Sequence, residues 1–104
     1  MFKKMIQEKR EYRAYKKRVN ELPEEYKKAM KAIESYMWSF AKGSGMFEVL
    51  TNILEMFESS ASDGLSIREV VGNDIAEFAD SFLAEFPEET WIDKLRNELR
   101  NSIK

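Results

Sequence analysis

The residue types that most often carry out chemistry in proteins are absent from this chain or lie in contexts that do not support it. Its 104 residues include no cysteine and no histidine, so a thiolate nucleophile, a disulfide, an imidazole base and a Cys/His zinc site are excluded. Ser44 lies between two glycines, but the Gly-x-Ser-x-Gly pattern is absent and no histidine can activate its hydroxyl. We therefore interpret residues 43–45 as a connection between helices, and predict no catalytic residue, no cofactor and no small-molecule substrate.

The carboxylates are the next source of chemistry. Glu55 and Glu58 are three residues apart, as are Glu77 and Asp80, so each pair shares one side of a helix. A general acid needs burial or a close like charge to shift its pKa, whereas these residues fall on the polar sides of their helices. We interpret them as solvated surfaces, with a weak cation site as the alternative. No metal site is predicted, and an enzyme is the least favoured class.

A basic cluster near the N-terminus is a stronger signal. It comprises Lys9, Arg10, Arg13, Lys16 and Lys17. Such cations can bind phosphates, and the interleaved Tyr12 and Tyr15 could stack on bases. No complete helix-turn-helix pattern follows, and the whole chain has a net charge of −2, which disfavours a duplex. Nucleic-acid binding through this helix is therefore the alternative function. A membrane surface is disfavoured because lysines interrupt the apolar side of the helix.

The small net charge conceals an uneven distribution. Residues 1–31 carry eleven Lys or Arg and five Glu, whereas residues 32–104 carry six Lys or Arg and fourteen Asp or Glu. The chain is therefore a basic arm followed by an acidic body. The arm could contact an acidic partner or a nucleic acid, or it could lie against its own body or that of a second copy.

The spacing of apolar residues is helical nearly throughout and predicts an all-α fold. We expect one compact domain over residues 1–104, with a basic helix at 1–20 that protrudes or lies at an interface, and an acidic body at 22–104. Five sizeable helices are expected, with one short helix after Ser66; their approximate ranges are 2–20, 23–41, 45–60, 73–86 and 90 to the end. The helix at 45–60 is apolar over more than half its circumference, which predicts a central position.

Local signals predict several helix ends. The Ser-x-x-Glu pattern at 66–69 is typical of a capping box, and Gly72 should stop the short helix. Asn73 or Asp74 can cap the helix that follows. The serine-rich segment 59–64 is expected to be a loop.

Aromatic and methionine side chains on the arm, or away from the main apolar stripe of the second helix, form a candidate partner surface. They are Phe2, Met5, Tyr12, Tyr15 and Trp38. Such residues are common at interface centres, and a homodimer formed through the first helix is the favoured version. The alternative is that Trp38 packs against another helix of its own chain.

The location is predicted to be cytoplasmic. The N-terminal residues turn charged before any signal-peptide-like apolar region, and no apolar run is long enough to span a membrane.

Four segments resemble a bacterial family of unknown function, domain of unknown function 1048, common in Bacillus-like organisms. They are Leu22-Pro23 with Tyr26, Tyr36-Met37-Trp38, Leu54 with Phe57-Glu58, and the run from Val70 to Phe78. The resemblance covers about residues 10–85 and implies an all-helical, short left-handed superhelix without an established activity or cofactor. It also suggests a role beside PadR-like transcription regulators, and hence a regulator or a second copy as the protein partner. Asn73 stands where an acidic residue is expected in many members.

Overall fold

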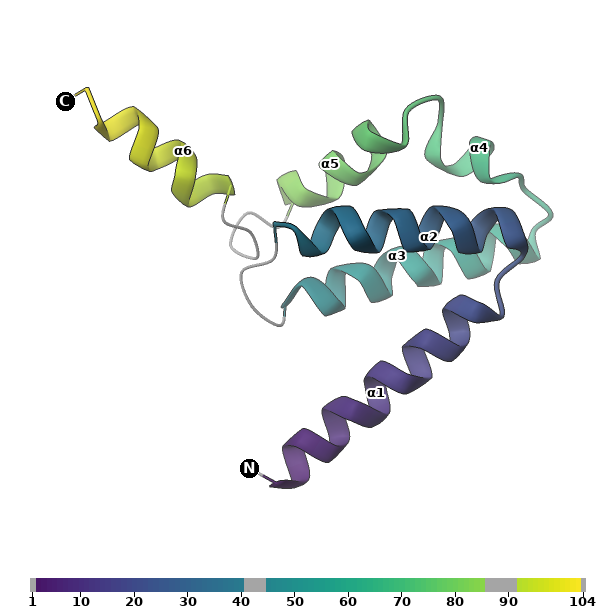
Figure 1. Cartoon of the computed structure of the whole chain (residues 1–104). Helices are drawn as coiled ribbons and strands as arrows, with labels where there is room; N and C mark the ends of the chain where they lie inside the picture. The colour runs from purple at the N-terminus through teal and green to yellow at the C-terminus, as the bar shows by residue number, and fades with distance from the viewer. Residues whose placement is uncertain (1, 41–44, 86–91, 104) are drawn as a thin grey trace.

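The computed structural model describes residues 2–40, 45–85 and 92–103, and within these ranges the regular structure is entirely α-helical (Figure 1). Six helices follow one another: α1 (Phe2–Asn20), α2 (Glu24–Trp38), α3 (Gly45–Ser62), α4 (Ile67–Val71), α5 (Ile75–Glu85) and α6 (Ile92–Asn101). The all-α prediction of five longer helices and one short helix is therefore confirmed. Of the predicted connection at 43–45, Gly45 begins α3, and the first two residues lie outside the described ranges.

Helices α2 and α3 form the centre together, because α3 packs against α1, α2 and α4, and α2 packs against α1, α3, α4 and α5. The buried side chains of α3 are Met46, Val49, Leu50, Ile53, Leu54 and Phe57. Helix α2 contributes Tyr26, Met30, Ile33 and Met37, which recur at helical spacing along the face turned toward α3. The apolar stripe of α3 is too wide to be covered by a single helix, and three helices pack against α3, as the width of the stripe predicts. Met56, at the edge of that stripe, is exposed.

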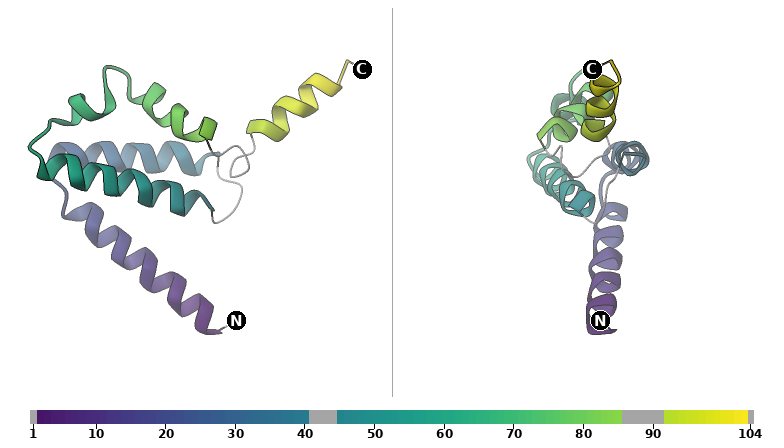
Figure 2. Two further views of the ribbon diagram at one scale, coloured as in Figure 1. Left: turned by 180° about the vertical axis from the view of Figure 1, so that it is seen from behind. Right: turned by 90° about the vertical axis from the view of Figure 1, so that its left-hand side faces the viewer.

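Helix α1 is attached to this core through its C-terminal half. Tyr15 and Val19 are buried there, and Leu22 is buried in the turn that leads into α2. Toward its N-terminus α1 diverges from α2 and α3, as the views in Figures 1 and 2 agree. The arm is therefore part of the fold at one end and extends from it at the other.

Hydrogen bonds in the structure form the helix caps that the local sequence patterns predict. The Ser66 hydroxyl accepts from the Glu69 amide, and the Glu69 carboxylate accepts from the Ser66 amide, which completes the predicted capping box. Asp74 caps α5 by accepting from the amides of Ala76 and Glu77. Gly72 ends α4 with a φ of 80°, in the left-handed region.

Two expected helix ends are wrong. The segment 59–64 is not a loop from its start, because α3 continues to Ser62. It stops at Gly64, whose φ of 80° allows the Leu65 amide to donate to the Ser60 carbonyl and the Gly64 amide to donate to the Ala61 carbonyl. A left-handed glycine, rather than the serines before it, therefore ends the helix. Helix α2 ends at Trp38 instead of near 41, with turn hydrogen bonds at Ser39 and Phe40.

The outline of the molecule is more extended than the compact domain expected. Its radius of gyration is 15.8 Å, whereas a compact chain of this length has about 13 Å. The difference arises at both ends of the chain, because the N-terminal part of α1 and the whole of α6 extend from the α2–α5 body and diverge from each other (Figure 2). No helix of the described residues is both long enough and apolar enough to cross a membrane.

Candidate functional site

Three aromatic side chains from three helices border a groove at the open end of the α1–α2–α3 junction. Tyr12 comes from α1, Trp38 is the last residue of α2, and Phe47 is in the first turn of α3. The rings of Tyr12 and Phe47 are tilted, with centroids 6.1 Å apart. The groove has a volume of about 540 Å³ and is open to solvent on one side. It exists because α1 diverges from α3, which leaves Tyr12 and Phe47 only partly covered.

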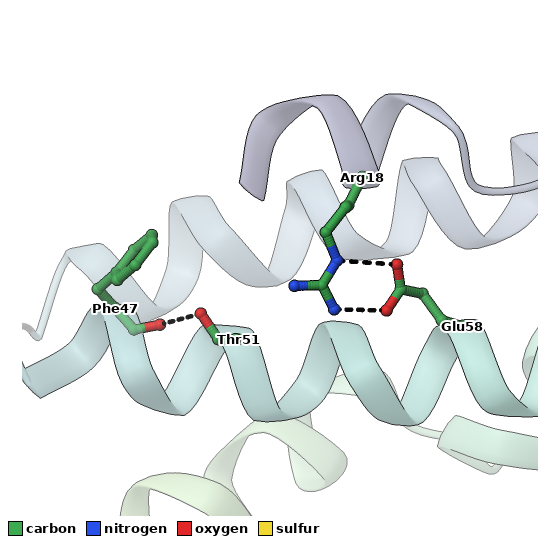
Figure 3. Close-up of polar contacts among 4 residues, drawn as sticks. All are labelled: Arg18, Phe47, Thr51 and Glu58. Carbon is green, nitrogen blue, oxygen red and sulfur yellow. Dashed lines mark hydrogen bonds and ion pairs between the residues drawn. The ribbon is translucent and has the colours of Figure 1, made fainter. Parts of the chain in front are cut away.

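The rim of this groove is acidic. Glu8 and Glu11 line it from α1, and Glu48 lines it from α3. Thr51 completes the lining, with its hydroxyl donating a 2.9 Å hydrogen bond to the Phe47 carbonyl one turn earlier (Figure 3). An aromatic floor with carboxylates around it suits an apolar segment that also carries basic side chains. Nothing in this lining resembles a nucleophile with its base.

Tyr15 is not a partner-surface residue, which corrects the sequence-based expectation. It is 3% exposed and packs edge to face against Phe47, with ring centroids 5.2 Å apart. Its position seven residues from Leu22 and four from Val19 places it on the core face of α1, one turn from the exposed Tyr12. Tyr15 therefore supports the groove from beneath and does not line it.

The Tyr15 hydroxyl is buried without a hydrogen-bond partner among the described residues. Burial raises the pKa of this hydroxyl well above its ordinary value, because the charged phenolate would be desolvated. The nearby Glu34 carboxylate raises that pKa further through its negative charge, although it does not complete a hydrogen bond to the hydroxyl. The group is therefore neutral at physiological pH.

Trp38 is exposed, so it is not sealed inside its own chain. It separates the aromatic groove from a second, more polar hollow of about 470 Å³ between α1 and α2, which Lys16, Lys31 and Glu34 also line. Tyr12 borders both hollows. The two exposed aromatic residues of the predicted partner surface thus lie together, whereas the side chains of Phe2 and Met5 lie outside the described residues.

The predicted nucleic-acid residues form one exposed stripe along α1. All of Lys9, Arg10, Arg13, Lys16 and Lys17 are exposed, and at 100° per residue they fall within an arc of about 120°, opposite the buried Tyr15 and Val19. Lys16 lies over the Tyr12 ring, 5.4 Å from its centroid, and Lys17 pairs weakly with Glu21 at 4.0 Å. The structure therefore brings these cations together beside the groove, because Lys9 and Arg13 line a shallow hollow with Glu8 and Tyr12, which also line the groove.

One basic side chain of the arm does bind the acidic body. The Arg18 guanidinium donates two hydrogen bonds to the Glu58 carboxylate, at 3.0 Å from Nε and 2.6 Å from the terminal nitrogen (Figure 3). This hydrogen bonding and charge raise the pKa of Arg18. The pair joins residues 40 apart in sequence, so no local pattern could have indicated it. Arm and body thus attract each other at the attached end of α1.

One carboxylate of each acidic pair singled out in the sequence makes a contact within the fold. Glu58 binds Arg18, and Asp80 accepts a 2.5 Å hydrogen bond from the Tyr36 hydroxyl, which links α2 to α5. Across the described ranges, no group of three or more Asp or Glu side chains is placed to hold a metal ion. Glu58 and Asp80 therefore have structural partners, whereas Glu55 and Glu77 lie exposed on the surface.

The described residues define a small all-α protein with an aromatic, acid-rimmed groove. The chain belongs to the DUF1048 family, described as protein of unknown function, whose model matches residues 3–104. A crystal structure of a DUF1048 protein from Bacillus cereus ATCC 10987, described as a left-handed superhelix fold, is similar with 37% identity and a TM-score of 0.59. The match covers 65% of this chain and 86% of that one. Among curated proteins, none matches the chain significantly.

These comparisons confirm the family and the left-handed superhelix that the sequence resemblance implied. They assign no activity, and no enzyme family is indicated. The groove itself was missed by sequence reasoning in two respects. Phe47 was not singled out from the apolar residues of its helix, and Glu8, Glu11 and Glu48 were not singled out from the other carboxylates.

Proposed function

We propose that this chain is a protein interaction module that binds through the groove between α1, α2 and α3. The observation that carries the proposal is the side-by-side exposure of Tyr12 and Trp38 over the partly buried Phe47. Large aromatic side chains that remain accessible in a concave surface are typical of the centres of protein interfaces. The acidic rim favours a partner whose contacting segment is apolar and basic.

A PadR-like transcription regulator is the partner class that the family resemblance suggests, and self-association is the other. Either partner would have to present a segment with apolar and basic side chains to the groove. A cytoplasmic location is part of this proposal and rests on the sequence alone.

The test is the assembly state of the full chain, alone and with the nearest-encoded transcription regulator, measured by light scattering. Trp38→Glu should lower the affinity of whichever assembly forms at least tenfold, because it places a charge in an apolar, acid-rimmed groove. Met56→Glu is the matched control, since Met56 is 40% exposed and Trp38 is 41% exposed. Met56 also lies on the side of α3 away from Phe47. If no assembly forms, or if both variants behave alike, the proposal is wrong.

Nucleic-acid binding remains a second candidate because the five cations of the α1 stripe are all exposed on one face. Cations that follow one side of a helix can bind successive phosphates, and such binding weakens steeply with salt. The discriminating experiment measures duplex binding at low and raised salt for the wild type and for a variant with Arg10, Arg13, Lys16 and Lys17 changed to Glu. Salt-sensitive binding that this variant loses supports the second candidate. No binding at low salt eliminates it.

A further inference from the structure

Helix α6 and the turn that follows it carry the most exposed large apolar side chains of the described residues. Leu95, Leu99 and Ile103 are 60%, 74% and 91% exposed. Their spacing of four residues places them on one stripe along the helix and the turn that follows. An exposed stripe of this kind is costly in water, and so it indicates a surface that is covered by a partner.

The charges along one border of this stripe complement the groove, while Glu98 lies on the other border. Arg96 and Arg100 follow the first of these borders, each one position after a leucine. The groove has the opposite character at its rim, where Glu8, Glu11 and Glu48 surround the aromatic floor. Apolar side chains would meet Tyr12, Trp38 and Phe47, while the two guanidinium groups would meet carboxylates.

In this structure α6 does not cover the groove of its own chain. Helix α6 lies beyond the ends of α2 and α3, and it points away from α1 in each view (Figures 1 and 2). The groove, by contrast, is bordered by α1. Each chain therefore presents both an uncovered stripe and an uncovered groove, and its own α6 points away from that groove.

We infer that α6 of one copy lies in the groove of a second copy, so that two chains exchange their C-terminal helices. The arrangement is reciprocal: each chain donates Leu95, Leu99 and Ile103 and accepts the same residues from the other. Such a pairing closes at two copies, as isologous dimers do. The inference rests on the proposed function, because it names the segment that binds the groove.

The first experiment compares the masses of full-length variants in solution. The wild type should have twice the 12.3 kDa mass of one chain. Leu95→Glu combined with Leu99→Glu should give single chains, with helix content unchanged because both side chains are exposed. The control combines Asn97→Glu with Asn101→Glu, which adds the same charges to the opposite side of α6 and should remain dimeric. A wild type of single mass, or equal masses for the two variants, overturns the inference.

The groove variant separates this inference from the proposed function. If Trp38→Glu abolishes an assembly that the α6 variant retains, the groove binds a partner but α6 is not its occupant. If both variants reduce the dimer while Met56→Glu does not, the inference is supported. If neither variant changes the assembly, both the inference and the groove proposal are wrong.

Cross-linking tests the contact itself. Because the chain has no native cysteine, only the introduced cysteines can form a disulfide. One population carries Thr51→Cys in the groove, and the other carries Leu99→Cys in α6. Mixed under oxidising conditions, they should form a disulfide-linked pair containing one chain of each kind. Replacing Leu99→Cys with Asn101→Cys should greatly reduce the yield. A chain carrying both Thr51→Cys and Leu99→Cys that closes on itself without dimerising would show that α6 occupies its own groove, and would overturn the exchange.

Discussion

Tyr15 of α1 and Phe47 of α3 meet edge to face, with ring centroids 5.2 Å apart and ring planes inclined by 63°. This contact lies where the two helices begin to diverge, so it marks the boundary between the core and the groove. On the core side Tyr15 is buried, and on the groove side Phe47 meets the exposed Tyr12. The stability of the fold and the shape of the groove are therefore set by neighbouring rings.

Removing the Tyr15 hydroxyl should not destabilise the protein. Because the hydroxyl is buried without a hydrogen-bond partner, Tyr15→Phe should leave the free energy of unfolding unchanged or raise it by about 1 kcal/mol. Tyr15→Ala also removes the ring and should cost about 3–5 kcal/mol. Urea unfolding of both variants measures the difference. A loss of more than about 1 kcal/mol for Tyr15→Phe would show that the hydroxyl has a partner.

Stability should fall at alkaline pH. The pKa values of Tyr15, Tyr26 and Tyr36 are all raised in the folded chain, for Tyr15 and Tyr26 chiefly by burial and for Tyr36 chiefly by its hydrogen bond to Asp80. The unfolded chain then loses these protons first, near pH 10, so the free energy of unfolding decreases as the pH rises above that value. Urea midpoints between pH 8 and pH 11, in the wild type and in Tyr15→Phe, test this. The variant should show a shallower decline, and identical slopes would contradict the assignment to Tyr15.

The Arg18–Glu58 pair should contribute measurably to stability, and Lys17–Glu21 should not. Both side chains of the first pair are 37% exposed, and the contact has two hydrogen bonds. We expect a coupling free energy of about 0.5–1 kcal/mol, reduced by added salt. A double-mutant cycle with Arg18→Ala and Glu58→Ala measures it. The 4.0 Å pair Lys17–Glu21 is more exposed and serves as the control; equal coupling in both cycles would contradict the prediction.

Gly72 should be intolerant of a side chain although there is space for one. No atom lies within 4 Å of a Cβ built there, but the backbone angles are φ 80° and ψ −158°, a region accessible essentially to glycine alone. Gly72→Ala should therefore cost about 1–3 kcal/mol through the backbone. The decrease would appear in thermal or urea unfolding. Ala76→Gly offers a comparison on the exposed first turn of α5, with an expected cost of about 0.5–1 kcal/mol; a smaller loss for Gly72→Ala would contradict the argument.

Much of the fold could be predicted because its signals are local. The wide apolar stripe indicated that α3 contacts several helices, and the Ser66 and Asp74 caps follow from residues within one turn. Tyr12 and Tyr15 show where such reasoning stops. They share one broad side of α1, and only the angle at which α1 crosses α3 makes one exposed and the other buried. The Arg18–Glu58 contact and the acidic rim of the groove depend on the same crossing.

The attachment of α1 at one end also makes this helix a lever. Ten residues separate Glu8 from Arg18, so they lie about 15 Å apart along the helix axis. A tilt of roughly 10° about the Arg18–Glu58 contact would move Glu8 by about 2.6 Å, while Tyr15 and Val19 would hardly shift. Such a tilt would change the width of the groove while the buried end of α1 stayed in place, and would let the groove accept segments of different bulk.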